Sequence, residues 1–189
     1  MAKFENKFSG KRVFITGADG FIGSHLAEAL VQGGAKVTAL ALNNSSGSCG
    51  WLDETADETR AEMRIELGDV RDGVQMRTLA EGSEIVVHLA ALIGIPYSYI
   101  APQHYVQTNI QGTVNVLDAC LREEVRRLVH TSTSEPYGTA QRLPIDEEHP
   151  LVGQSPYSAS KIAADQMAIS YQRSFDLPVA IVRPFNTYG

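Results

Sequence analysis

Tyr157 and Lys161 stand four residues apart in the segment SPYSASK, a spacing that places both side chains on one face of a helix. A tyrosine, with a reference pKa of about 10, is a poor base at neutral pH. A nearby ammonium group and the positive charge of an oxidised cofactor ring would favour the phenolate. The pair is therefore a candidate for moving a proton to and from a substrate hydroxyl, although the same spacing also occurs in surface pairs.

A second polar cluster, HTSTSEPYGTA, places several hydroxyl side chains directly before Glu135. Hydroxyls beside a carboxylate can form a helix start, a turn or a catalytic surface, because short Ser/Thr clusters often bind their own backbone. From these residues alone all three interpretations remain open. The cluster follows the apolar run LVHTS, which places it at the carboxyl end of a predicted strand, where parallel sheets bind ligands.

The segment TGADGFIGSHL places Gly17, Gly20 and Gly23 between the apolar run RVFIT and a helical pattern. Glycines in such a turn allow close approach of the backbone to a pyrophosphate and close packing of helix on strand. The helix N-terminus adds amide donors and a partial positive charge. In this context the spacing GxxGxxG predicts dinucleotide binding rather than a plain structural turn.

The choice between NAD and NADP is left open by the end of the second predicted strand, KVTALALNN. No Asp or Glu stands near Ala41 to hold the adenosine ribose, and no Lys or Arg is present to hold a 2′-phosphate. Asn43 and its polar neighbours could hydrogen-bond either cofactor. We lean to NAD because no cation is available. In GDVRD, Asp69 could accept from the adenine amino group with Val70 against the ring, or it could be a loop cap.

Short apolar runs alternate with longer segments that carry apolar residues at helical spacing. The runs predict buried strands at Arg12–Thr16, Lys36–Leu42, Met63–Leu67, Ile85–Ala90, Leu128–Ser132 and Val179–Arg183. Helices are predicted at Phe21–Gln32, Gly73–Glu81, Tyr105–Glu123 and Tyr157–Phe175, and loops at Asn43–Gly50 and Gly138–Ser155. This alternation predicts an α/β fold, a Rossmann-type doubly wound parallel sheet with helices on both faces.

Composition narrows the class of protein. The chain has 189 residues, 43% hydrophobic and 20% charged, with a net charge of −6 and no basic run, which argues against nucleic acid as a partner. The start is polar and no apolar run is long enough to span a membrane, so no membrane partner is expected. The two cysteines and five histidines lack metal-ligand spacing, so no metal site is predicted. These features favour a reduced, cytoplasmic protein.

The motifs together resemble the extended short-chain dehydrogenase/reductase family, which includes the NAD-dependent epimerases and dehydratases of nucleotide sugars. The motifs that carry the resemblance occur in family order: TGADGFIG, GDVRD, HLAAL, TNIQGT, STSEPYG, YSASK and RPFNTYG. Within the family the chain is most similar to nucleotide-sugar 4,6-dehydratases. The segments NNSSGSCGWLD, HLAALIGIPYSY and TSTSEPYGTAQ resemble the UDP-N-acetylglucosamine 4,6-dehydratase type.

The resemblance implies a reaction that begins with oxidation of the sugar. Thr133 would hydrogen-bond the 4-hydroxyl, and Tyr157, supported by Lys161, would take its proton as hydride leaves C4. The 4-ketone acidifies the hydrogen on C5. Glu135 would then remove that proton, water would leave from C6, and hydride would return to C6. The substrate implied is a UDP-linked hexose or N-acetylhexosamine.

Other positions follow from the same resemblance. Asn109 would kink its helix and organise a water near Lys161. The sugar nucleotide would be contacted by Ser98, Ser134 and Asn186. The cofactor would be bound by Gly17, Gly20, Phe21, Ile22, Gly23, Asn43, Asp69, Val70, Leu89, Ala90, Ala91, Tyr157 and Lys161. A homodimer would form through helices 105–123 and 157–175.

The chain departs from the family pattern at three places. Ser134 stands where glucose-type dehydratases carry aspartate, which points to another sugar class. Pro136 replaces a branched apolar residue and could redirect Glu135. Family members continue beyond RPFNTYG, so we expect 1–189 to form the dinucleotide-binding domain without its C-terminal substrate-binding portion. The alternatives are a nucleotide-sugar epimerase, a UDP-glucuronate-type decarboxylase, or a catalytically silent dinucleotide-binding module.

Overall fold

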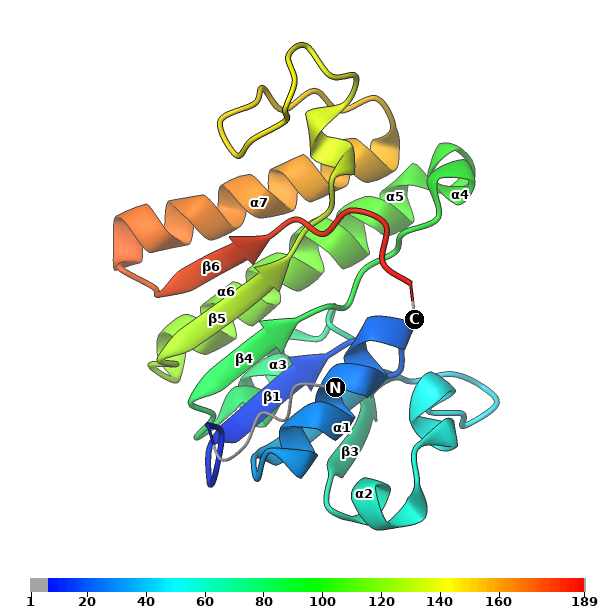
Figure 1. Cartoon of the computed structure of the whole chain (residues 1–189), viewed down its shortest axis with the longest axis vertical. Coiled ribbons are helices and arrows are strands. Elements are labelled where there is room, and N and C mark those ends of the chain that lie inside the picture. The colour runs from blue at the N-terminus through cyan, green and yellow to red at the C-terminus, as the bar shows by residue number, and fades with distance from the viewer. Residues whose placement is uncertain (1–6, 189) are drawn as a thin grey trace.

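The structure, a computed structural model, describes residues 7–188; residues 1–6 and 189 of the predicted domain lie outside the described part. Its centre is a six-stranded sheet in the order β3-β2-β1-β4-β5-β6, in which every neighbouring pair is parallel (Figure 1). The strands are β1 (Arg12–Thr16), β2 (Lys36–Leu42), β3 (Arg64–Gly68), β4 (Ile85–His88), β5 (Arg127–Thr131) and β6 (Val179–Val182). The predicted Rossmann-type fold class is confirmed.

Helices cover both faces of this sheet. The longer ones are α1 (Phe21–Gln32), α3 (Gly73–Ala80), α6 (Gly112–Arg122) and α7 (Pro156–Phe175). The side-chain alternation of β1 shows the division, because Phe14 packs into the core beneath α3, α6 and α7, whereas Val13 and Ile15 pack beneath α1. The two cores hold the strand ends in fixed relation to the helix starts.

The predicted strands and helices agree with the observed ones to within one or two residues at each end, except for the helix predicted over 105–123. That helix is divided into α5 (Pro102–Tyr105), a π-helical segment η2 (Val106–Gln111) and α6. π-Helical turns insert a wider turn and are frequent at functional sites. Here the wider turn carries Asn109, whose side chain is bound outside the helix.

Several short elements were not predicted. These are α2 (Asp57–Ala61), α4 (Ile95–Ile100) and the 3₁₀ turns η1 (Gly50–Glu54) and η3 (Glu135–Tyr137). Elements of three to six residues are too short to display a helical period in the sequence. Among the described residues no helix is long and apolar enough to cross a membrane.

Candidate active site

A cleft of about 850 Å³ lies at the carboxyl ends of the strands, the edge at which parallel sheets bind ligands. It is lined by the end of β2 and by the loops that follow the other five strands. The predicted site residues that line it are Gly17, Gly20, Phe21, Ile22, Gly23, Asp69, Val70, Leu89, Ala90, Ala91, Thr133, Glu135, Tyr157, Lys161 and Asn186. Four others, Asn43, Ser98, Asn109 and Ser134, are not part of the cleft lining.

The glycine loop is packed too closely for side chains. Gly17 has φ +68°, and a Cβ there would lie 2.6 Å from the backbone nitrogen of Ala90. A Cβ on Gly23 would collide with the carbonyl oxygen of Gly17, whereas at Gly20 the nearest atom would be 3.4 Å away. The loop thus lies flat against the chain after β4, and its Gly20 side remains open.

The start of α1 fits a pyrophosphate. Its N-cap residue, Gly20, provides no side-chain cap, and its first turn contains no acidic residue. Uncapped amides and the helix dipole attract phosphate oxygens. The residues present therefore match the group that a dinucleotide would place at this point.

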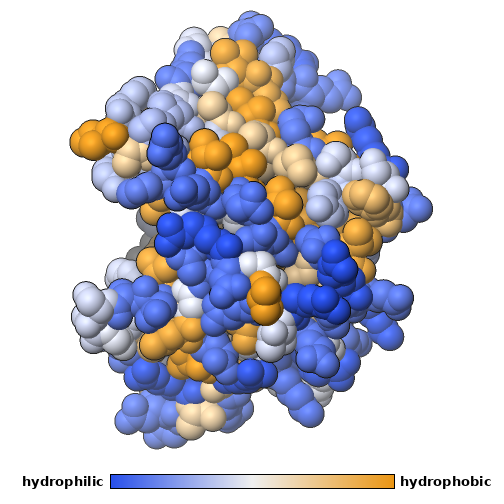
Figure 2. Space-filling view, turned by 180° about the vertical axis from the view of Figure 1, so that it is seen from behind, coloured by the Kyte–Doolittle hydropathy of each residue, from blue (hydrophilic) through white to orange (hydrophobic). Residues whose placement is uncertain are grey.

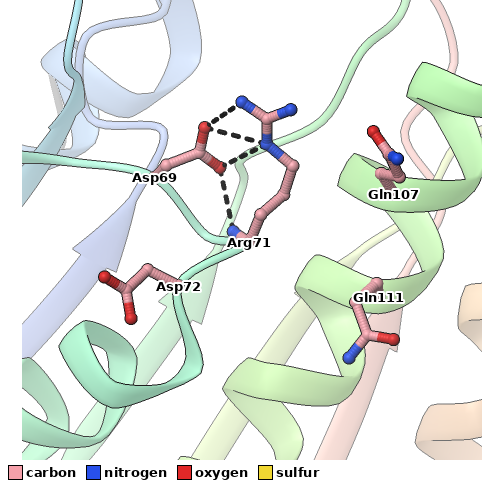
Figure 3. A pocket seen from close by; sticks show the side chains of 5 residues that line it. All are labelled: Asp69, Arg71, Asp72, Gln107 and Gln111. Carbon is pink, nitrogen blue, oxygen red and sulfur yellow. Dashed lines mark hydrogen bonds and ion pairs between the residues drawn. The ribbon is translucent and has the colours of Figure 1, made fainter.

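After β3, the carboxylate of Asp69 is paired with Arg71. Arg71 Nε lies 2.9 Å from Asp69 Oδ2, and Arg71 Nη2 lies 2.5 Å from the same oxygen (Figure 3). Partial burial alone would raise the pKa of Asp69, but the hydrogen bonds and charge of Arg71 outweigh it and lower the pKa. The predicted adenine contact of Asp69 must therefore share the carboxylate with Arg71, a residue that the sequence patterns did not single out.

The side chain of Asn43 lies outside the cleft lining, although its backbone N–H donates to the carbonyl of Gly68 (2.9 Å). The side chain of its neighbour Asn44 is bound within the loop, because its Oδ1 accepts from the backbone N–H groups of Ser46 and Ser48. A carboxylate from the glycine loop contacts this end of β2, because Asp19 Oδ2 accepts from the Leu42 backbone N–H at 3.1 Å.

The opposite end of the cleft holds the Tyr157–Lys161 pair at the start of α7, where Ser155 accepts from the backbone N–H of Ser158. Lys161 is 4% exposed, and its Nζ donates to the carbonyl of Thr131 at 2.8 Å. Burial lowers the pKa of Lys161 to about 8, although the charge of Asp165 opposes the shift. Lys161 is thus fixed by the strand end that also carries Thr133.

Tyr157 is 6% exposed, and its ring packs edge-on against Tyr105 at 6.2 Å. Burial raises the pKa of Tyr157; a hydrogen bond with the Thr133 hydroxyl lowers it in part, and the negative charge of Glu135 raises it further. Thr133, after β5, and Glu135, in η3, are therefore near enough to Tyr157 on α7 to change its pKa.

Glu135 is exposed at the first position of η3, and Pro136 follows it as a buried residue. Proline is tolerated in a first helical turn because its missing N–H would have no partner there. The carbonyl of Pro136 accepts from Val152 N (2.7 Å), and the Ser158 hydroxyl donates to the carbonyl of Glu135 (2.8 Å). The expected disturbance by Pro136 is thus absorbed by the turn, and Glu135 still lines the cleft.

Three of the predicted residues outside the cleft lining make contacts of their own. Ser98 is fully buried in α4, and its hydroxyl donates to the carbonyl of Ile95. Ser134 precedes η3 without capping it. The Asn109 amide binds both the N–H and the carbonyl of Leu92, and donates to Ser160 Oγ at 2.9 Å. Asn109 therefore connects η2 to α7 and to the loop after β4.

A buried ionic cluster lies behind the catalytic end. Asp165, fully buried on α7, accepts from Ser132 Oγ (2.9 Å) and from Arg183 Nε (3.0 Å), and lies 3.2 Å from His130 Nε2. The sequence analysis did not identify this cluster. One signal was present, since Asp165 follows Lys161 by one helical turn.

A doubly wound parallel sheet, with a glycine loop and a tyrosine–lysine pair at the two ends of one cleft, defines a short-chain dehydrogenase/reductase-type protein. Within this class the chain belongs to the GDP-mannose 4,6 dehydratase family, whose model matches residues 14–189.

Similar proteins include a dTDP-glucose 4,6-dehydratase of Streptomyces antibioticus, 36% identical over 94% of this chain and 53% of the relative. Among solved structures, the dTDP-glucose 4,6-dehydratase DesIV of Streptomyces venezuelae with NAD and TYD bound has a TM-score of 0.81 at 32% identity, over 94% of this chain and 56% of its own. A UDP-N-acetylglucosamine 4-epimerase of Methanobrevibacter ruminantium M1 has a TM-score of 0.87 at 30% identity, over 96% and 56%. The chain thus spans about half the length of these relatives.

Proposed function

We propose that the chain is the cofactor-binding part of an NAD-dependent nucleotide-sugar 4,6-dehydratase, a lyase, acting on a UDP-linked hexose or N-acetylhexosamine. The observation that carries the proposal is the shared cleft of Glu135, Thr133 and Tyr157, in which a carboxylate stands beside a proton-transfer pair. An oxidation needs only the tyrosine and lysine. The added carboxylate suits an elimination, because a second base must remove the proton on C5.

NAD in this cleft would supply the hydride acceptor for oxidation at C4 and the hydride donor for reduction at C6. Gly20 and the uncapped start of α1 would bind its pyrophosphate, and Leu89 to Ala91 would lie against its nicotinamide end. The solved relative DesIV contains NAD, which supports the same cofactor for this chain. Arg71 would not be free to bind the 2′-phosphate of NADP, because it is paired with Asp69.

Each of the side chains at the catalytic end would carry out a different part of the reaction. Thr133, already hydrogen-bonded with Tyr157, would orient the 4-hydroxyl toward the phenol oxygen. The ammonium of Lys161 would favour the phenolate as the tyrosine accepts the proton. Glu135, exposed and lining the cleft, would take the proton from C5 and pass it to the departing C6 hydroxyl, which leaves as water. One carboxylate would thus serve as base and acid in turn. As hydride then adds to C6, C5 would take up a proton from solvent, which balances the 4-hydroxyl proton released through Tyr157.

A nucleotide-sugar epimerase is the second candidate, because the Methanobrevibacter epimerase has a TM-score of 0.87. An epimerase product has the mass of its substrate, whereas a dehydratase product is lighter by one water and a decarboxylase product by one carbon dioxide. Mass spectrometry of a UDP-, GDP- and dTDP-sugar panel incubated with the chain and NAD distinguishes them. Unchanged masses and unchanged sugars, with NAD still bound, would support the silent dinucleotide-binding module instead.

The Glu135→Gln variant is expected to lose the water-elimination product by about 100- to 10,000-fold, because the amide cannot accept the C5 proton. The measurement is the rate of formation of the dehydrated sugar by mass spectrometry. Glu147→Gln, an exposed glutamate in the loop after η3, is the matched control and should keep the full rate. Elimination at an unchanged rate in Glu135→Gln would refute the assignment of this residue.

We also propose a homodimer through α5–α6 and α7. Figure 2 shows hydrophobic side chains gathered over the part of this face where these helices lie. Val106, in η2, is 53% exposed, and Phe175, at the end of α7, is 54% exposed. Apolar side chains left on one face of paired helices favour burial against a second copy.

A cytoplasmic location is proposed on the basis of two buried, unpaired cysteines, Cys49 and Cys120.

The dimer is tested by light scattering at micromolar concentration, where we expect twice the chain mass of 20.5 kDa. Val106→Lys should shift the population to monomer, because the charge would be buried in the interface. Val74→Lys, at a 79% exposed valine on α3, is the control and should remain dimeric. A wild-type mass equal to one chain would contradict the proposal.

A further inference from the structure

The end of β2 lacks the acidic side chain that commonly binds the adenosine ribose in dinucleotide-binding sheets. The strand finishes at Leu42, and Asn43, which follows it, has an exposed side chain outside the cleft lining. Asn44 uses its amide within its own loop, donating to the carbonyls of Leu42 and Ser48. Neither asparagine after β2 therefore lines the cleft in which the ribose would lie.

A carboxylate nevertheless lies at this point, and it comes from the glycine loop. Asp19 lines the cleft, and its Oδ2 accepts the backbone N–H of Leu42 at 3.1 Å. The hydrogen bond spans 23 residues of chain and holds the carboxylate at the carboxyl end of β2. Its second oxygen, Oδ1, has no hydrogen-bond partner among the described residues.

The position of Asp19 is fixed by its backbone as well as by its side chain. Its carbonyl oxygen accepts the N–H of Trp51 at 2.9 Å, which docks η1 against the glycine loop. The preceding residue, Ala18, donates to the carbonyl of Leu40 at 3.0 Å. A carboxylate held by Leu42, on a backbone fixed at Leu40 and Trp51 and with one free oxygen, is preorganised to accept a hydrogen bond from a ligand.

The charged side chains around the cleft also limit which ligand group can lie beside Asp19. Among the residues the structure describes, the lysine and arginine side chains that line the cleft are Arg71 and Lys161. Arg71 is held by Asp69, and Lys161 is buried at the catalytic end. A phosphate beside Asp19 would thus meet an uncompensated negative charge, which costs binding energy.

We infer that Asp19 is the specificity residue for the cofactor: its free carboxylate oxygen accepts the 2′-hydroxyl of the adenosine ribose and repels a 2′-phosphate. The glycine loop thereby supplies the acid that β2 does not. This inference rests on the proposed dinucleotide binding and deepens it, because it assigns the choice of NAD over NADP to one residue.

The test is titration calorimetry of the whole chain with NAD and with NADP. Wild type is expected to bind NAD at least about 10-fold more tightly than NADP, since one charge-assisted hydrogen bond and one repulsion separate them. Asp19→Asn keeps an oxygen for Leu42 N but removes the charge. This variant should lose about 10-fold in NAD affinity and gain in NADP affinity, so that the ratio of the two falls toward one.

A control variant and a second variant of Asp19 complete the test and separate the effect of the charge from that of the anchoring. Asp57→Asn, in the first turn of α2, removes an exposed carboxylate elsewhere and should leave both affinities unchanged. Asp19→Ala removes the anchor as well as the charge. An affinity ratio that changes in Asp19→Ala but not in Asp19→Asn would overturn the inference and leave Asp19 as an anchor only. Wild type that binds neither cofactor would overturn the proposed function together with this inference, whereas unaltered NAD preference in both variants overturns the inference alone.

Discussion

Tyr157→Phe is expected to reduce turnover of nucleotide sugars by about 100- to 10,000-fold, the range in which a lost acid–base group acts. The phenol oxygen is the atom that would receive the 4-hydroxyl proton, and Thr133 already hydrogen-bonds with it. Removing the oxygen stops the first step, so neither nicotinamide reduction nor water loss should follow. The measurement combines nicotinamide absorbance with product mass after a single addition of substrate.

The effect should appear in chemistry and not in cofactor binding. NAD affinity should change by less than about 10-fold in Tyr157→Phe, because the glycine loop and α1 supply the pyrophosphate contacts. Tyr171→Phe, on the same helix but outside the cleft lining, is the matched control and should retain full turnover. Substantial turnover in Tyr157→Phe would exclude the tyrosine as the proton acceptor.

The cofactor half of the cleft could be predicted because its signals are local. Gly17 and Gly23 stand at fixed offsets after an apolar strand, and no side chain could replace their hydrogens without collision. The lysine four residues after Tyr157 is equally local, since a helix alone places them on one face. Such features need no knowledge of distant contacts, so the sequence reveals them.

Other features depend on contacts between segments far apart in the chain. Ser98 matches a substrate-contacting serine by motif, but the turn of α4 directs its hydroxyl to Ile95. The π-helical turn at Asn109 arises because its amide binds Leu92, 17 residues earlier. Asp19 is equally hidden, because only the folded sheet brings Leu42 N to its carboxylate. A pattern of residue types carries no information about these pairings.

The ionic cluster at Asp165 shows what such pairings contribute to the catalytic end. Asp165 joins β5, through Ser132, to the end of β6, through Arg183. Ser132 immediately precedes Thr133, and Lys161 lies one turn before Asp165 on α7. The Asp165 carboxylate therefore links the carboxyl end of β5, next to Thr133, to the part of α7 that carries Lys161.

Asp165→Ala is expected to lower the free energy of unfolding by about 3–5 kcal/mol, because it leaves buried partners of one ion cluster without their counter-charge. Arg183 Nη2 lies 2.9 Å from Asp165 Oδ2, and the arginine side chain is only 14% exposed. His130 adds little positive charge to this cluster at neutral pH, since burial lowers its pKa. Urea denaturation at neutral pH, followed by circular dichroism, measures the change.

The matched control is Asp118→Ala, which removes an aspartate–arginine pair on the surface. Arg122 Nε lies 2.8 Å from Asp118 Oδ2, yet these side chains are 55% and 47% exposed, respectively. Solvent screens such a pair, so the loss should be at most about 1 kcal/mol. Equal losses of unfolding free energy in the two variants would show that burial does not make Asp165 contribute more to stability than the exposed Asp118.

The same cluster predicts a pH dependence of stability with a definite sign. Burial alone would raise the pKa of Asp165, but the close approach of His130, the hydrogen bond from Ser132 and the charge of Arg183 outweigh it and lower the pKa. A carboxyl whose pKa is lower in the folded chain stabilises the fold above its unfolded pKa of about 4 and loses that contribution as the pH falls further. The difference in unfolding free energy between wild type and Asp165→Ala should therefore be full at neutral pH and shrink on acidification below that value. A difference that stays constant into that acidic range would mean that the carboxylate charge is not what joins β5, β6 and α7.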